Sequence, residues 1–162
     1  MSTVPVILRH ATLNDLPRIL EVFTQSIIRT ASADYSKEQV QAWLLGAENI
    51  EGWTRRIASQ YFIVAISGTD IIGFGSIEKD YLDLMFVHPD FIRQGIATKI
   101  CRTLIDYAVA RNEIRIHTHA SITARSFFES IGFTVIRVNR FDLNGTQMFN
   151  YVMHYAVPAE RN

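Results

Sequence analysis

The sequence predicts a single domain of mixed α/β (α+β) fold, in which helices flank a mostly antiparallel sheet. Its 162 residues suffice for one domain with a buried core. The expected elements follow the order strand, two or three helices, three strands, helix, strand, helix and two strands. The strand–helix–strand segment in the middle indicates one parallel crossover in this sheet. We expect the domain to span residues 1–162, with its core over about residues 6–157.

The N-terminal third contains one strand and two or three helices. Residues 4–9 have the composition of a strand. Thr12 and Asp15 have the spacing of a helix capping box, and apolar residues then recur at helical spacing over residues 13–28. Ser36 is expected to cap a second helix, KEQVQAWLL, and residues 53–58 predict a third.

The middle of the chain predicts three strands and then a helix. The strands are YFIVAI, IIGFGSIEK and YLDLMFV, which form a local antiparallel meander. The helix begins at Gly95, and its apolar residues form a broad face that we expect to be buried. Cys101 lies on this face, so we interpret it as an inert core residue.

The C-terminal third predicts a strand, a helix and a strand pair. The strand covers residues 113–118, and the helix covers about residues 122–130 and ends at Gly132. The final pair covers residues 133–139 and 148–155, with a turn at Asn144 and Gly145.

Composition excludes several classes of protein. Apolar residues make up 48% of the chain, charged residues 20%, and the formal net charge is zero. No global field therefore favours nucleic acid or an anionic membrane. The single cysteine excludes an internal disulfide and a multi-cysteine metal site. The apolar runs are too short to span a bilayer and the N-terminus does not resemble a signal peptide, so we expect a cytoplasmic protein.

The stretch HPDFIRQGIATKI places an arginine and a lone glycine at the start of a helix. A helix N-terminus offers unpaired N–H groups and partial positive charge, which suit an anion. Gly95 would let a phosphate approach the backbone closely, and Arg93 adds a cation. These residues alone allow two interpretations, a pyrophosphate site or merely a tight turn before a packed helix.

The neighbouring residues extend this pattern. LMFVHPDFIRQGIATKI, followed after a strand by ASITARSFFESIGF, resembles the GNAT superfamily of acyl-CoA N-acyltransferases, and the order of elements fits over nearly the whole chain. The residues that carry the likeness are Val87, Pro89, Gly95, Ala97, Ala124, Phe127, Phe128, Gly132 and Phe133. Two further stretches, TASADYSKEQVQAWL and LNGTQMFNYVMHY, resemble a bacterial branch of acetyltransferases called YafP-like.

The resemblance implies acetyl-CoA as cosubstrate and a role for each matching position. Backbone groups of Met85, Phe86 and Val87 would pair with the pantetheine arm, in a space opened by strand edges that splay after Val87. Ala124, Phe127 and Phe128 would flank the thiol end of the cofactor. The pyrophosphate would be held mainly by N–H groups of Arg93, Gln94, Gly95, Ile96, Ala97 and Thr98.

Three positions depart from the pattern of the family. Ile92 stands where a glutamine or arginine is common, so one side-chain contact to the cofactor is missing. Phe128 stands where the family often has a tyrosine that protonates the leaving thiolate, and phenylalanine has no proton to give. Ser121 replaces a frequent asparagine. The usual general acid is therefore absent.

Asp83, His119 and Ser121 are the candidate catalytic residues. Asp83 lies in an apolar strand, where it would act as a base through water, bind the cation of the acceptor, or form a structural hydrogen bond to a neighbouring strand. His117 and His119 share one strand face, and no further metal ligand is near in sequence, so we expect no metal. His119 is the acid/base candidate; the alternative is that both histidines are only partly exposed polar residues of the strand. Ser121 is a further candidate, or only caps the next helix.

The acceptor is expected between the first helices and the last strand pair, near Tyr35, Trp43 and Asn150. An aromatic pair suits a cationic or planar acceptor, whereas a tryptophan in such a helix is also a common core residue. The scattered basic residues are interpreted as solvated surface, with no nucleic-acid partner: Arg55, Arg56, Arg115, Arg125, Arg137 and Arg140.

The sequence thus predicts an acetyl-CoA-dependent N-acetyltransferase. It would act on a primary amine of a small molecule or protein by direct attack in a ternary complex. The alternative is a catalytically weak acyl-CoA-binding module for sensing or protein interaction, motivated by Phe128. The resemblance also implies a homodimer, paired through the C-terminal strands, as one option. No membrane partner is expected.

Overall fold

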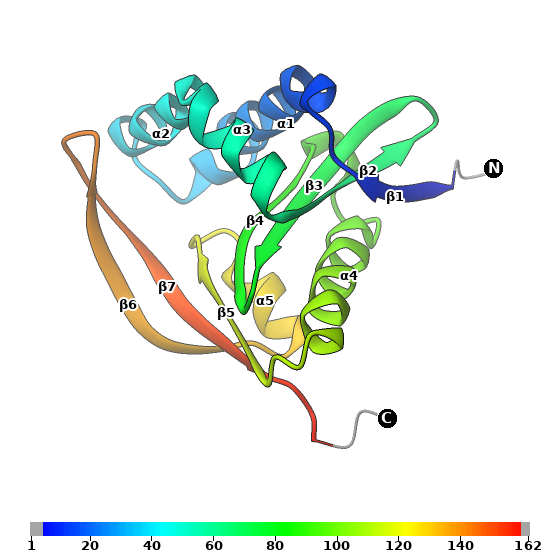
Figure 1. Ribbon diagram of the computed structural model, residues 1–162. Coiled ribbons are helices and arrows are strands. Elements are labelled where there is room, and N and C mark those ends of the chain that lie inside the picture. The colour runs from blue at the N-terminus through cyan, green and yellow to red at the C-terminus, as the bar shows by residue number, and fades with distance from the viewer. Residues whose placement is uncertain (1–4, 160–162) are drawn as a thin grey trace.

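The computed structural model describes residues 5–159, which form a seven-stranded sheet with helices on both faces (Figure 1). The strands are β1 (Val6–His10), β2 (Tyr61–Ser67), β3 (Asp70–Glu78), β4 (Tyr81–Val87), β5 (Arg115–Ala120), β6 (Thr134–Leu143) and β7 (Thr146–Ala156). Their spatial order is β1-β2-β3-β4-β5-β7-β6, and β4 and β5 are the parallel pair in an otherwise antiparallel sheet. The predicted fold class, including its single crossover, is confirmed.

Two apolar cores lie on opposite faces of the sheet. The helices are α1 (Leu16–Arg29), α2 (Lys37–Leu44), α3 (Ile50–Ser59), α4 (Ile96–Ala110) and α5 (Arg125–Ile131). Side chains alternate along β2, so Phe62 and Val64 pack with α1 and α3, whereas Ile63 and Ala65 pack with α4. Cys101 is fully buried in the α4 core, as predicted. Among residues 5–159, no helix is long and apolar enough to cross a membrane.

Polar side chains set several element boundaries. Ser36 caps α2 as predicted, because its Oγ accepts the N–H of Gln39 at 3.1 Å. α3 begins earlier than predicted because Asn49 caps it and accepts the N–H of Gly52 at 3.1 Å. β1 begins at Val6; the predicted start at Val4 lies outside the described residues.

Two C-terminal elements begin later than the sequence indicated. β5 starts at Arg115 and extends to Ala120, because it pairs with β7 over that whole span. α5 starts at Arg125 because a turn precedes it, in which the Ser121 Oγ accepts the N–H of Ala124 at 3.1 Å. Gly132 ends α5 with a φ of 121°, in accord with the predicted terminus.

The position of α4 depends on two glycines of β3. A Cβ on Gly75 would lie 2.7 Å from Cγ2 of Ile100, and a Cβ on Gly73 would lie 3.2 Å from its Cδ1. The helix therefore lies closer to the sheet than a larger residue would permit. This packing fixes the N-terminus of α4 beside the end of β4 (Figure 1).

The sheet opens between β4 and β5. The two strands pair only at Tyr81 with His117 and at Leu82 with Thr118, and the Thr118 hydroxyl donates to the carbonyl of Leu82 at 2.8 Å. Beyond this point β4 continues along β3 while β5 continues along β7. The divergence therefore starts after Leu82, five residues before the predicted start after Val87.

The β6–β7 hairpin closes the other side of this opening. It is the longest strand pair of the sheet, and its tip reaches the helix layer (Figure 1). The Asn144 amide donates to the carbonyl of Ala42 at 3.2 Å, and Gln39 donates to the carbonyl of Gln147 at 3.1 Å. The space between β4, β5, α2 and the hairpin is thereby enclosed by secondary structure.

Candidate active site

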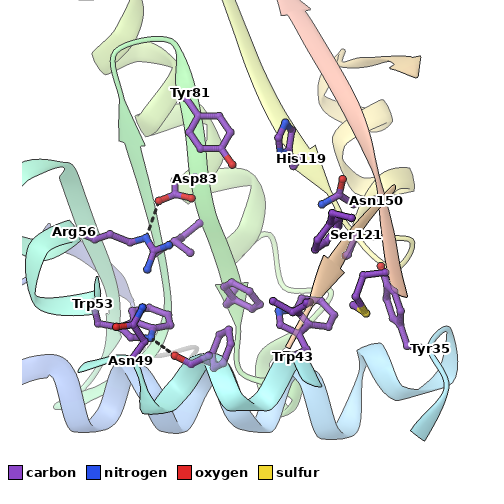
Figure 2. Close-up of a pocket in the computed structure, with 17 residues that line it drawn as sticks. Tyr35, Trp43, Asn49, Trp53, Arg56, Tyr81, Asp83, His119, Ser121 and Asn150 are labelled. Atoms are coloured by element: carbon purple, nitrogen blue, oxygen red, sulfur yellow. Dashed lines mark hydrogen bonds and ion pairs between the residues drawn. The ribbon is translucent and has the colours of Figure 1, made fainter. Parts of the chain in front are cut away.

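A cavity of about 340 Å³ lies where β4 and β5 diverge. It is bounded by β4 and β5, by α2 and α3, and by the β6–β7 hairpin (Figure 2). Six residues singled out from the sequence line it: Tyr35, Trp43, Asp83, His119, Ser121 and Asn150. The fold therefore brings the predicted catalytic residues and the predicted acceptor-binding residues to one place.

Asp83 is held by helix α3. Its Oδ2 accepts the Nε–H of Arg56 and the amide of Gln60, both at 2.9 Å, and its side chain is only 14% exposed. Its hydrogen-bond partners thus belong to helix α3 and its C-terminal cap. A hydrogen bond to a neighbouring strand, the structural role considered from the sequence, is not what holds it. Its second oxygen points away from Arg56, toward the side of the cavity where Tyr81 and His119 lie (Figure 2). A negatively charged oxygen is therefore presented to a ligand.

His119 lies across the cavity from Asp83, on β5. Partial burial lowers the pKa of His119 below its usual value, and electrostatic repulsion from the neighbouring His117 and Arg137 side chains adds to this, against a smaller opposing effect of Asp83. The imidazole is therefore neutral at pH 7, and a neutral imidazole can accept a proton. Both histidines contact the Tyr81 ring, which confirms that they share one face of the strand.

Tyr81 adds a hydroxyl that was not selected from the sequence. Burial, reinforced by the charge of Asp83, raises the pKa of Tyr81 to about 12. The hydroxyl therefore stays protonated over the physiological range and can donate a hydrogen bond. Its ring stacks on His117 with centroids 4.8 Å apart, which fixes its orientation.

Ser121 and Tyr35 join the cavity to the neighbouring loop. The Ser121 hydroxyl caps the turn before α5 and not the helix itself, whose N-cap is Ala124, and it also lines the cavity. The Tyr35 hydroxyl accepts the N–H of Ile122 at 2.9 Å, and burial raises the pKa of this tyrosine. Tyr35 thus connects the α1–α2 segment to the β5–α5 loop.

Aromatic and aliphatic side chains form most of the remaining wall. Trp43 is half-buried and contacts the rings of Tyr35 and Phe86 at centroid distances of 5.3 and 6.4 Å. It lines the cavity and also packs against core residues, so both interpretations made from the sequence apply. Asn150 accepts a hydrogen bond from Asn139 at 3.0 Å. The other apolar lining residues include Phe23, Trp53, Leu84, Phe141, Leu143 and Met148.

Two smaller hollows continue from the cavity toward α4. The first, of about 70 Å³, shares Asp83, His119 and Ser121 with the cavity and also contacts Phe128. The second, of about 160 Å³, reaches the start of α4. Its lining includes residues from each of the three predicted parts of the cofactor site, namely the arm, the thiol end and the pyrophosphate: Met85, Phe86, Val87, Ala124, Phe127 and Ala97. The hollows thus lead from Asp83 through the strand opening to the helix N-terminus.

The loop before α4 has an unusual backbone. Arg93 and Gly95 both have positive φ values, of 63° and 80°. A Cβ on Gly95 would meet no atom within 4 Å, so open space lies beside the backbone. Gln94 and Thr98 are exposed, whereas the Ile96 side chain is buried in the core. Ile96 can therefore contribute to an anion site only through its N–H group.

Arg56 corrects the expectation that it belongs to the solvated surface arginines. It lines the cavity, pairs with Asp83 and has its guanidinium 5.7 Å from the Trp53 ring centroid. One signal pointed to it: an acidic residue in an apolar strand needs partners, and Arg56 and Gln60 are four residues apart at the end of one helix.

No three His, Cys, Asp or Glu side chains within residues 5–159 are grouped to hold a metal ion.

Comparisons with known proteins agree with this geometry. Residues 31–155 match the family model described as the acetyltransferase (GNAT) domain. The uncharacterized N-acetyltransferase YafP of Escherichia coli (strain K12) is 31% identical over 148 residues, which are 91% of this chain and 94% of that protein.

Solved structures share the fold over nearly the whole chain. A GCN5-related N-acetyltransferase from Rhodopseudomonas palustris superposes with a TM-score of 0.92 at 27% identity, covering 97% of this chain and 99% of that one. The PaiA N-acetyltransferase from Thermoplasma acidophilum, solved in complex with coenzyme A, gives a TM-score of 0.77 at 18% identity, over 94% of this chain and 99% of that one. The second likeness concerns the fold alone.

Proposed function

The chain belongs to the GNAT family and is an acetyltransferase, and from this premise we propose that it moves an acetyl group from acetyl-CoA to a primary amine of a small molecule or protein. The amine would attack the thioester directly in a ternary complex. The observation that carries the proposal is the hollow, made of three adjoining parts with shared lining residues, that leads from Asp83 through the β4–β5 opening to the start of α4.

The residues along this hollow fit coenzyme A. β5 no longer pairs with β4 beyond Leu82, so one edge of β4 is unpaired along Met85 to Val87. Backbone groups on this edge can pair with an extended amide-containing arm. The open space beside Gly95 and the first N–H groups of α4 suit a pyrophosphate. Acetyl-CoA, when bound, would supply an activated acyl group and a thiolate leaving group. That a neighbouring N-acetyltransferase of this fold holds coenzyme A supports the assignment.

The cavity residues would manage charge and protons around the acceptor. The free oxygen of Asp83 would bind the acceptor's amino group and orient its nitrogen toward the opening. The neutral His119 would take one proton from the bound ammonium and leave a neutral amine to attack; the second proton, lost as the N–C bond forms, would pass to the thiolate as the C–S bond breaks. Tyr81 would offer a hydrogen bond near the sulfur as the C–S bond breaks, which is a role that Phe128 cannot fill.

Direct attack agrees with the position of the one cysteine. Cys101 lies in the α4 core, away from the cavity lining, and burial raises the pKa of its thiol to about 12. A thiol with such a pKa supplies almost no thiolate at neutral pH, so it does not serve as an acyl-carrying nucleophile. The acetyl group would therefore move from donor to amine without an intermediate on this cysteine.

The test is amine-dependent release of free thiol from acetyl-CoA, with mass spectrometry of the acetylated product. We expect the wild-type protein to release thiol with at least one class of amine. Asp83→Asn should lower the rate about 100-fold, because the variant keeps the shape of the side chain and loses its charge. Glu51→Gln, an exposed change on α3, is the matched control and should leave the rate unchanged.

One result would replace the proposal with its alternative. If coenzyme A raised the melting temperature while every amine failed to accelerate thiol release, the chain would be a binding module. If acetyl-CoA at millimolar concentration did not shift the melting temperature at all, neither interpretation would stand.

A further inference from the structure

We infer that the acceptor is a free α-amino acid with an apolar side chain, whose carboxylate binds Arg56 while its amino group binds Asp83. The inference rests on the proposed acetyl transfer and names its substrate class. It is carried by the opposite charges of Arg56 and Asp83 on one wall of an otherwise mostly apolar cavity.

Arg56 has donors that the protein leaves unused. Its Nε–H bonds to Asp83, and its two terminal nitrogens donate no hydrogen bond to any of residues 5–159. The side chain is 35% exposed and faces the cavity, with its guanidinium beside the Trp53 ring. A guanidinium fixed along its Nε edge presents its terminal nitrogens as a fork, which matches a carboxylate in a bidentate manner.

Asp83 supplies the complementary negative charge directly beside the guanidinium of Arg56. Both hydrogen bonds from α3 and its C-terminal cap end on Oδ2, so the other oxygen remains for a ligand. Because Asp83 and Arg56 contact each other at 2.9 Å, one ligand that reaches both must carry its cation and anion close together. An α-amino acid does so, since its amino and carboxylate groups share one carbon atom. The neutral sum of the two protein charges also matches a zwitterion better than a simple cationic amine.

The rest of the wall indicates the side chain of the acceptor. Trp43, Phe86 and Met148 face the cavity beyond the charged pair, with no further ion pair among the described lining residues. A volume of about 340 Å³ accommodates an amino acid with a medium or large apolar side chain. Leucine, methionine and phenylalanine have this character.

The experiment compares acceptors that share a side chain and differ in the carboxylate. L-phenylalanine, L-phenylalaninamide and 2-phenylethylamine are tested by thiol release, with the wild-type protein and with Arg56→Gln. We expect the wild type to favour the free acid about 10- to 100-fold in kcat/KM, because the other two lack the carboxylate that pairs with the guanidinium. Arg56→Gln should reduce this ratio toward one, mainly through KM. Arg55→Gln, the exposed neighbour, is the matched control and should keep the wild-type ratio.

The outcomes separate the inference from the proposed function. If 2-phenylethylamine or the amide were acetylated as well as the acid, acetyl transfer would stand and the amino-acid assignment would be overturned, with the amide pointing to peptide N-termini. A ratio unchanged in Arg56→Gln would also overturn it. If no amine of any class released thiol, the proposed function itself would fail. Leucine and methionine with their decarboxylated amines should repeat the pattern of phenylalanine.

Discussion

At the scale of single residues, Asp83 and His119 divide two tasks by their environments. Arg56 and Gln60 hold one oxygen of Asp83, and the other oxygen stays open to a ligand. His119 stays neutral because burial, together with repulsion from the His117 and Arg137 side chains, opposes its protonation. A carboxylate that binds an amine and an imidazole that accepts its proton can therefore operate at the same pH.

The role of His119 predicts a specific pH profile. Its pKa lies below the ordinary value of 6.5, so the imidazole gains its proton, and loses its function as a base, only below pH 6.5. We expect kcat to fall on the acidic side of pH 6.5, and His119→Gln to lower kcat about 100-fold and remove this fall. His154→Gln is the control, because its pKa is also lowered but it does not line the cavity. An unchanged profile in His119→Gln would assign the proton transfer to another group.

At the scale of elements, the sequence predicted helix starts, caps and turns, which depend on adjacent residues. It did not predict features that depend on contacts between segments distant in sequence. The helix from Gly95, the Ser36 cap and the Asn144–Gly145 turn follow from glycine conformation and side-chain hydrogen bonds, which adjacent residues encode. The start of the β4–β5 divergence depends on where β4 stops pairing with β5 and each strand pairs only with its other neighbour. The sequence therefore predicted this start five residues too late, after Val87 and not after Leu82. Arg56 was missed because its partner is distant in sequence.

The loop before α4 predicts unequal effects of two substitutions. Gly95→Val should weaken coenzyme A binding at least tenfold, because the new side chain fills the open space beside the backbone and strains a residue with φ of 80°. Arg93→Ala should weaken binding less, since backbone N–H groups are expected to make most of the contacts to the pyrophosphate. Isothermal titration gives both dissociation constants.

The matched control for Gly95→Val is Gly68→Val. Gly68 has a φ of 65°, and a Cβ added to it would likewise meet no atom within 4 Å, but it lies in the β2–β3 turn. The substitution should lower stability by a similar amount and leave binding unchanged. A larger loss from Arg93→Ala than from Gly95→Val would mean that the site depends on side-chain charge.

At the scale of the whole molecule, the sheet consists of two parts joined by a short pairing. β1 to β4 form one part and β5 to β7 the other, with two register pairs between them. The candidate site lies where these parts separate, and its residues come from both. The sequence predicted both sets of residues separately, because each belongs to its own motif. The family resemblance implied that residues of both parts meet around one cofactor, and the tertiary structure adds the cavity beside it and the Arg56–Asp83 pair.

Thr118 predicts how much this short pairing contributes to stability. It is 2% exposed and donates to the carbonyl of Leu82 at 2.8 Å, across the junction of the two parts. Thr118→Val keeps the shape and leaves that carbonyl without this partner, which should cost about 1–3 kcal/mol and lower the melting temperature by several degrees. Thr103→Val removes a hydroxyl that bonds within α4 and should change stability by less than about 0.5 kcal/mol. Thermal unfolding of both variants, each with and without coenzyme A, tests this prediction. Equal falls in the melting temperature of the two variants would show that the hydrogen bond across the junction has no special role. Because a bound cofactor would contact both parts, it should still raise the melting temperature of Thr118→Val.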